Sequence, residues 1–281
     1  MFNYNQSPFR PYASEVIPYG DPRRSPNPWR AIAAHVRWEI VLGFLVVIGF
    51  FAYMLAQEQE KLVIPGTIGL VVTGWIFSLC LHEFAHAATA YLGGDHSDGT
   101  RSYLSFNPLK YVNPLLSIIL PLVFIVLGGI GLPGGAVYVR RDLVRNRAWQ
   151  SAISLAGPLM NALCLLVIGL VFKLGLVQTH LALAGALGLL ALFEAFAIVL
   201  NLLPIPPLDG FGVIAPWLPR EVQTVAYTFG AYGVLLVFLV LYQAPQVAGG
   251  LYNVMFTMMG QLSIDPFWAG IGLRTFQFWI H

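Results

Sequence analysis

Charged residues are scarce in this sequence, since Asp, Glu, Lys and Arg make up only 10% of its 281 residues. Soluble globular domains carry about 25%, so the composition excludes an ordinary soluble domain. The net charge of +2 gives no reason to expect nucleic acid as a partner. Apolar residues are abundant instead: 57% of the chain is hydrophobic and its mean hydropathy is +0.71. The composition therefore predicts a membrane protein.

Cysteine and histidine are scarce as well. The two cysteines, Cys80 and Cys164, both lie inside apolar runs. This placement is typical of small buried hydrophobic residues and argues against a disulfide or a Cys-rich metal site. The six histidines are too few for a membrane desaturase. Any metal chemistry must therefore depend on a small number of residues.

Long apolar stretches are the main feature that is present. A helix needs about 20 apolar residues to cross the hydrocarbon core, and six stretches come close to that length: 38–56, 67–92, 114–131, 150–175, 180–202 and 222–243. A weaker seventh lies at 247–260, and the aromatic tail after it indicates an interfacial segment. We predict an all-α polytopic membrane protein with about six transmembrane helices.

The distribution of arginine predicts orientation and domains. Short cytoplasmic loops are rich in Lys and Arg, and the arginines before the first span (Arg10, Arg23, Arg24, Arg30 and Arg37) predict a cytoplasmic N-terminus. The loops on either side of 114–131 are both basic. We therefore expect a re-entrant or hairpin segment there, with a full span as the alternative. The predicted domains are a Pro- and Arg-rich cytoplasmic tail (1–34), a membrane domain (35–245) and an amphipathic or interfacial C-terminal segment (246–281).

One stretch carries a zinc-protease pattern, His82-Glu83-Phe84-Ala85-His86. Residues four positions apart share a helix face, so both imidazoles can bind one Zn²⁺. Glu83 can accept a proton from water held at the metal. The preceding residues are almost wholly apolar, and ionisable side chains within a span are costly and usually functional. The alternative is a pair of helix-packing histidines, with Glu83 bonded to a neighbouring helix.

A catalytic zinc site also needs a third protein ligand and an open position. His180 lies at a span end and is better explained as an interfacial residue. Glu194 shares a helix face with Asn201, so it either reaches the site or a water path, or bonds to a neighbouring helix. Asp209 follows a proline-rich run that lets the chain bend inward, although Asp-Gly is also ordinary turn chemistry. Spacing alone does not separate these two interpretations of Asp209.

The sequence resembles the site-2 protease family of intramembrane metalloproteases. His82–His86 matches the family's first motif, Asn201–Gly210 matches its second, and Ala156–Asn161 matches a third signature between them. The predicted layout is similar to the compact six-helix members without PDZ or CBS domains. The resemblance implies that His82, His86 and Asp209 bind one Zn²⁺ per chain.

The resemblance also implies roles for the remaining polar residues. Glu83 would be the general base and acid, while Asn161 and Asn201 would position substrate or stabilise an oxyanion. The implied activity is hydrolysis of peptide bonds in or near transmembrane segments of other membrane proteins. The expected partners are a transmembrane protein substrate and the lipid bilayer, with room for a homo-oligomer or a regulatory membrane partner.

The expected location is a bacterial-type plasma membrane, with the active site near the cytoplasmic side. The main alternative is a non-catalytic membrane scaffold or transporter that uses the same polar residues. Glu83 argues against it, because a site that only binds metal has no need of that base. A CAAX-processing metalloprotease would take a later Glu as third ligand, so the motif that ends in Asp209 argues against that class.

Overall fold

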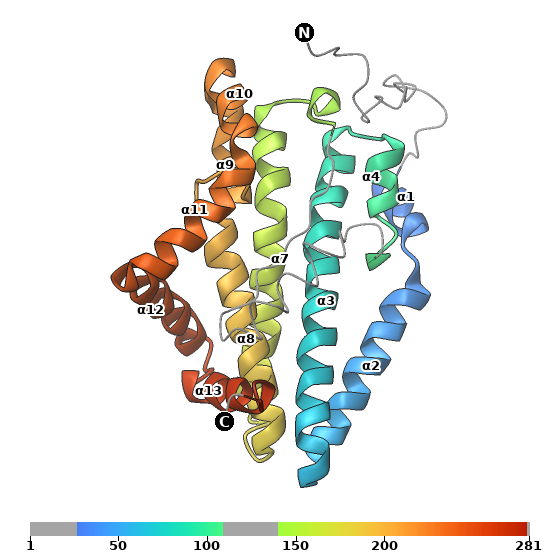
Figure 1. Cartoon of the computed structure of the whole chain (residues 1–281). Helices are drawn as coiled ribbons and strands as arrows, with labels where there is room; N and C mark the ends of the chain where they lie inside the picture. The colour runs from blue at the N-terminus through green and yellow to red at the C-terminus, as the bar shows by residue number, and fades with distance from the viewer. Residues whose placement is uncertain (1–26, 109–139, 280–281) are drawn as a thin grey trace.

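Four helices form the bundle in the computed structural model, which describes residues 27–108 and 140–279. They are α2 (Trp38–Ala56), α3 (Glu60–Gly93), α7 (Arg147–Lys173) and α8 (Leu181–Asn201), and each is long and apolar enough to cross a membrane. They run alternately down and up in Figure 1. The described residues contain no strand. The predicted all-α polytopic fold class is therefore confirmed.

Shorter helices surround the ends and one side of this bundle. They are α1 (Pro28–His35), α4 (Asp98–Tyr103), η3 (Arg141–Leu143), α9 (Asp209–Ile214), η4 (Ala215–Trp217), α10 (Arg220–Thr228), α11 (Gly230–Gln243), α12 (Pro245–Gln261) and α13 (Pro266–Phe276). Figure 1 shows α10 at the upper end, α11 and α12 descending beside α8, and α13 lying across the bundle near its lower end. The weaker stretch predicted at 247–260 corresponds to α12. The domain boundaries stay predictions.

Burial differs sharply between the long helices. In the most apolar 18-residue stretch of α8, 89% of the residues are buried, whereas in the corresponding stretch of α2 only 6% are buried. A helix that is apolar on every side is stable at the centre of a bundle, and α8 occupies that place between α3, α7 and α13. In contrast, α2 packs mainly on α3, and it leaves side chains such as Val46 69% exposed. An apolar surface of this kind suits contact with lipid.

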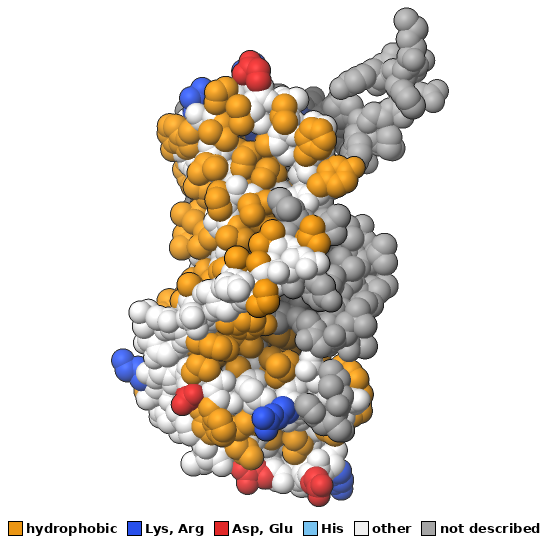
Figure 2. Space-filling view, turned by 60° about the vertical axis from the view of Figure 1, so that its left-hand side comes forward, with side chains coloured by type: hydrophobic (Ala, Val, Ile, Leu, Met, Phe, Trp, Pro, Cys, Tyr) orange, Lys and Arg blue, Asp and Glu red, His pale blue; other side chains and the backbone are white. Residues whose placement is uncertain are grey.

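The outer surface agrees with this arrangement. Figure 2 shows hydrophobic side chains over most of one face, while charged side chains gather toward its two ends. This is the distribution expected of a multi-pass integral membrane protein, because charge is costly in the hydrocarbon core.

One predicted span is wrong in its extent. The stretch 222–243 was expected to be one helix, but α10 ends at Thr228 and α11 begins at Gly230. The reason is tertiary packing: a Cβ at Gly233 would overlap the carbonyl oxygen of Pro206, so α11 lies directly against the turn that follows α8.

The C-terminal end of α3 and the start of α7 meet at the upper end of the bundle. The Arg145 amide donates to the Gly93 carbonyl at 3.0 Å, and the Arg140 amide donates to the Asp95 carboxylate at 2.9 Å. The predicted re-entrant or hairpin segment at 114–131 lies outside the described residues. The two hydrogen bonds described above therefore hold the C-terminal end of α3 beside the start of α7. Both helices contribute residues to the site described below.

Candidate metal centre

Two histidines on α3 face the same point inside the bundle. His82 and His86 are buried, and their Nε2 atoms are 3.0 Å apart. This is the one-turn spacing predicted from the sequence. Since α3 ends at Gly93, His82 lies about 16 Å below the upper end of the helix at 1.5 Å per residue. The pair is therefore located within the depth of the bundle rather than at its end.

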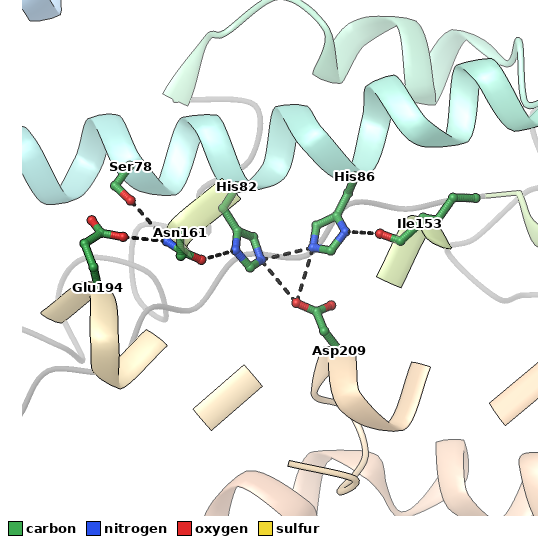
Figure 3. A network of polar contacts seen from close by, with 7 residues as sticks. All are labelled: Ser78, His82, His86, Ile153, Asn161, Glu194 and Asp209. Carbon is green, nitrogen blue, oxygen red and sulfur yellow. Dashed lines mark hydrogen bonds and ion pairs between the residues drawn. The ribbon is translucent and has the colours of Figure 1, made fainter. Parts of the chain in front are cut away.

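Asp209 reaches the same point from the opposite side. After α8 ends at Asn201, the chain turns through three prolines, and Asp209 is the first residue of α9. A Cβ at Gly210 would lie 2.5 Å from the carbonyl oxygen of Leu203, so glycine is needed for the turn to fold this closely onto the end of α8. The Oδ2 atom of Asp209 lies 3.2 Å from His82 Nε2 and 3.3 Å from His86 Nε2. Figure 3 shows both rings turned toward this carboxylate.

Helix α7 holds α9 in place and forms one wall of the site. The Ser151 hydroxyl donates to the Val213 carbonyl at 2.6 Å and accepts from Trp217 Nε1 at 2.9 Å. Six residues further along α7, the backbone of Gly157 passes beside the two imidazoles. A Cβ there would lie 2.5 Å from His82 Nε2 and would also overlap His86 Nε2. Only a residue without a side chain leaves the space between the histidines open.

The other nitrogen of each imidazole is held by an oxygen atom of α7. His86 Nδ1 lies 2.6 Å from the Ile153 carbonyl, and His82 Nδ1 lies 2.5 Å from Asn161 Oδ1. Both oxygens can only accept, so each Nδ1 carries a hydrogen and donates it. In a neutral imidazole the lone pair then lies on Nε2. Both Nε2 lone pairs therefore point at the space beside Asp209.

This set of donor atoms fits a metal ion. His82, His86 and Asp209 each offer one ligand atom, and these atoms all lie within 4.8 Å of one another. Two lone pairs and a carboxylate oxygen repel one another unless a cation lies between them. Ligands about 2.0–2.1 Å from a tetrahedral zinc ion lie about 3.3–3.4 Å from each other, which is close to the separations described above. The residues present therefore fit a zinc site with three protein ligands.

A second group of polar side chains supports His82. The Asn161 amide donates to Glu194 Oε2 at 2.8 Å and to Ser78 Oγ at 3.1 Å, while its oxygen accepts from His82. Asn161, Glu194 and Ser78 come from α7, α8 and α3, and all three are buried. Both N–H groups of Asn161 are thus engaged within the protein. This favours a positioning role for Asn161 over a contact with substrate.

The other predicted residues lie at different distances from this centre. Glu83 follows His82 on α3 and is only 2% exposed. Asn201 is the last residue of α8 and is partly buried. His180 precedes α8 at the opposite end of the bundle, where it lies 3.5 Å from Glu58, so it is too remote to join the histidine pair. The roles of Glu83 and Asn201 stay predictions.

Sequence reasoning missed two residues of the site. Ser78 lies four positions before His82, which is the spacing that places it on the same face of α3. The sequence did offer a signal for Ser78, because it is a polar residue in an apolar helix and lies one turn before the first histidine. Gly157 lies within the third signature, but its close approach to the imidazoles depends on how α7 packs on α3.

A His-His-Asp cluster between helices of a polytopic membrane protein, with both histidines buried and the aspartate partly buried, defines the class as a membrane protein with a zinc-protease-like centre. The chain belongs to the site-2 protease family. It is 37% identical over 239 residues to the protein named "Putative zinc metalloprotease Rip2" of Mycobacterium tuberculosis (strain H37Rv), covering 85% of this chain and 92% of that protein.

Two further relatives support the assignment. The protein of the same name from Mycolicibacterium smegmatis is 38% identical over 241 residues, covering 85% of this chain and 92% of the relative. The Bacillus subtilis protein named "Putative zinc metalloprotease YwhC" is 34% identical over 185 residues, covering 63% of this chain and 80% of the relative. No family model matches the chain. No solved structure is significantly similar to it.

Proposed function

We propose that this protein is an intramembrane zinc metalloprotease that hydrolyses peptide bonds in or near transmembrane segments of other membrane proteins. The observation that carries the proposal is the convergence of His82, His86 and Asp209 on one point inside a bundle of membrane-spanning helices. The names of the relatives support zinc as the metal. One Zn²⁺ per chain, held by these three residues, completes the proposal.

The chemistry divides between the metal and the chain. When bound, Zn²⁺ would supply Lewis acidity that polarises a carbonyl group and makes water more acidic. Glu83 accepts a proton from the attacking water and delivers it to the amide nitrogen as the C–N bond breaks. One peptide bond and one water thus become a carboxylate and an ammonium group. Gly157 keeps the space between the imidazoles open for these groups.

The depth of the site supports a membrane-embedded substrate. His82 lies about 16 Å below the upper end of α3, within the apolar part of the bundle. In an intact helix the peptide bonds are shielded by side chains and hydrogen-bonded internally. The substrate must therefore unwind locally before its backbone reaches the site. In this proposal, Asn201 at the end of α8 contacts the unwound segment.

The proposed orientation places the N-terminus in the cytoplasm and the site near the cytoplasmic side of a bacterial-type plasma membrane. Arg30 on α1 and the arginines in the segment before α7 support this, because short basic segments stay on the cytoplasmic side. A homo-oligomer or a regulatory membrane partner is compatible with the proposal.

The test measures zinc content and cleavage of a model transmembrane substrate by the detergent-purified full chain. Glu83→Gln should keep about one zinc per chain and lose at least about 100-fold in cleavage rate, because proton transfer is removed while the ligands remain. Asp209→Ala should lose both zinc and cleavage. Glu221→Gln, on the exposed surface of α10, is the matched control and should keep both. Full cleavage by Glu83→Gln would exclude Glu83 as the general base, whereas a wild-type chain that binds zinc but cleaves nothing would favour a scaffold or transporter.

A further inference from the structure

The two histidines of the site are held by different kinds of acceptor. His86 donates to the Ile153 carbonyl, a backbone group that cannot turn within α7. His82 donates to the side-chain oxygen of Asn161. A side-chain amide can rotate by half a turn, which exchanges its oxygen for its NH₂ group. Only the acceptor of His82 is therefore free to present the wrong atom.

The consequence of such a rotation is specific. A rotated Asn161 would offer an N–H to His82 Nδ1, and Nδ1 would have to accept. The ring hydrogen would then lie on Nε2, the atom that faces Asp209 at 3.2 Å. A protonated Nε2 has no lone pair for a metal. The orientation of one amide thus decides whether His82 can be a ligand.

Glu194 is the group that distinguishes the two orientations. Its Oε2 atom lies 2.8 Å from Asn161 Nδ2, and the side chain is only 2% exposed. The ionised form of this carboxyl accepts hydrogen bonds and cannot donate them, so it attracts the NH₂ group and repels the oxygen. The Ser78 hydroxyl, 3.1 Å from the same nitrogen, both donates and accepts, so it tolerates either orientation.

We propose that Glu194 is a positioning residue for the metal centre, which orients Asn161 and through it keeps the lone pair of His82 directed at the metal. The inference rests on the proposed function, because it assumes that His82 binds Zn²⁺. Figure 3 shows the relay in one line, from Glu194 through Asn161 to His82 and Asp209. Groups that orient a metal-binding histidine typically change metal affinity by about 10- to 100-fold when they are removed.

Three variants of the full chain in detergent test this, with the zinc dissociation constant measured by competition with a chelating dye. Glu194→Met keeps the approximate volume but removes the acceptor, and should weaken zinc binding by about 10- to 100-fold. Glu194→Gln keeps the shape but can donate as well as accept, so it no longer excludes the rotated amide and should weaken zinc binding by at least about threefold. The double variant Asn161→Asp with Glu194→Gln exchanges amide and carboxylate. His82 keeps an oxygen acceptor in it, so zinc binding should stay within about threefold of the wild type.

The outcomes separate positioning from packing. Leu192→Met, at a buried position on α8 outside this relay, is the matched control and should leave the zinc constant unchanged. A folded Glu194→Met chain that binds zinc like the wild type would overturn the proposal. So would an exchanged pair that binds as poorly as Glu194→Met is expected to bind. If Glu194→Met does not fold, the comparison of Glu194→Gln with the exchanged pair decides the question, because Asn161→Asp offers His82 an oxygen in either orientation. Equal zinc constants for these two variants would overturn the proposal.

The readout also distinguishes this inference from the proposed function. The zinc constants do not depend on cleavage, so the same series can be measured in a Glu83→Gln background. A wild-type chain that binds no zinc would overturn the proposed metal site itself. A wild-type chain that binds zinc, together with a Glu194→Met chain that binds it equally well, would overturn only the role of Glu194.

Discussion

At the scale of single residues, the space between the two imidazoles depends on Gly157. A methyl group at this position would lie 2.5 Å from His82 Nε2 and would overlap His86 Nε2. We therefore expect Gly157→Ala to weaken zinc binding by at least about tenfold, because the methyl group occupies the place of the metal or displaces a ligand ring. The measurement is zinc content after dialysis, together with the zinc dissociation constant.

The control for this substitution is Gly49→Ala on α2. Both glycines lie inside membrane-spanning helices, but a Cβ at Gly49 meets nothing within 4 Å. Replacing glycine by alanine in a helix interior usually favours the helix by about 1 kcal/mol. Gly49→Ala should therefore keep zinc binding and stability. Unchanged zinc binding in a folded Gly157→Ala chain would show that the metal does not lie between His82 and His86.

The residues of the site differ in how far the sequence could predict them. The pairing of His82 with His86 is local, since helix periodicity alone places positions four apart on one face. Asp209 is remote in the chain, and its Pro-Pro-Leu-Asp-Gly run suits a surface turn equally well. Only the family resemblance chose between these interpretations, and the structure brings its carboxylate within 3.3 Å of both histidines. The approach of Gly157 depends on interhelical packing, which no local pattern encodes.

At the scale of helices, α8 depends on close backbone contact with α13. A Cβ at Gly188 would lie 2.7 Å from the Trp268 carbonyl carbon and 2.8 Å from the Ala269 amide nitrogen. Backbone atoms cannot move aside as a side chain can, so Gly188→Ala should force the two helices apart. We expect a loss of about 1–3 kcal/mol in the free energy of unfolding, measured as a lower Tm or a lower denaturant midpoint in detergent.

A second glycine provides the comparison. A Cβ at Gly74 on α3 would lie 2.7 Å from a terminal carbon of Leu190, which can change its rotamer. Gly74→Ala should therefore cost less than Gly188→Ala, and Gly250→Ala, with nothing within 4 Å, should cost nothing. Equal stability of all three variants would contradict the close packing of α13 on α8.

Helix boundaries were predictable where hydropathy alone determines them. Apolar length placed α2 and α8 within a residue or two of their observed bounds, because nothing interrupts those runs. It failed at 222–243, where α10 and α11 are separate helices. Hydropathy counts apolar residues, but it does not register that Gly233 must approach the carbonyl of Pro206. This approach is a tertiary contact with the turn that carries Asp209, and apolar length alone does not encode it.

At the scale of the whole molecule, positive charge is unevenly distributed between the two ends. In the described part of the chain, elements toward the upper end in Figure 1 carry most of it, on Arg30, Arg37, Arg101, Arg140, Arg141, Arg145, Arg147 and Arg220. Elements toward the lower end carry Lys61, Lys173 and Arg274. Because basic segments tend to stay inside, we propose that the upper end faces the cytoplasm. This asymmetry was visible in the sequence, although the sequence could not show that α10 lies at the same end as α1.

This orientation can be tested with single cysteines at the two ends. Thr179 lies between α7 and α8 at the lower end, and Glu221 lies in the first turn of α10 at the upper end; both are exposed. In intact cells, a membrane-impermeant maleimide should label a Thr179→Cys chain but not a Glu221→Cys chain, which should react only after the membrane is opened. The unmodified chain is the control, because Cys80 is buried, Cys164 is partly buried, and both lie within membrane-spanning helices. The opposite labelling pattern would reverse the orientation and place the metal centre near the outer surface, so that substrates would have to be cleaved on that side of the membrane.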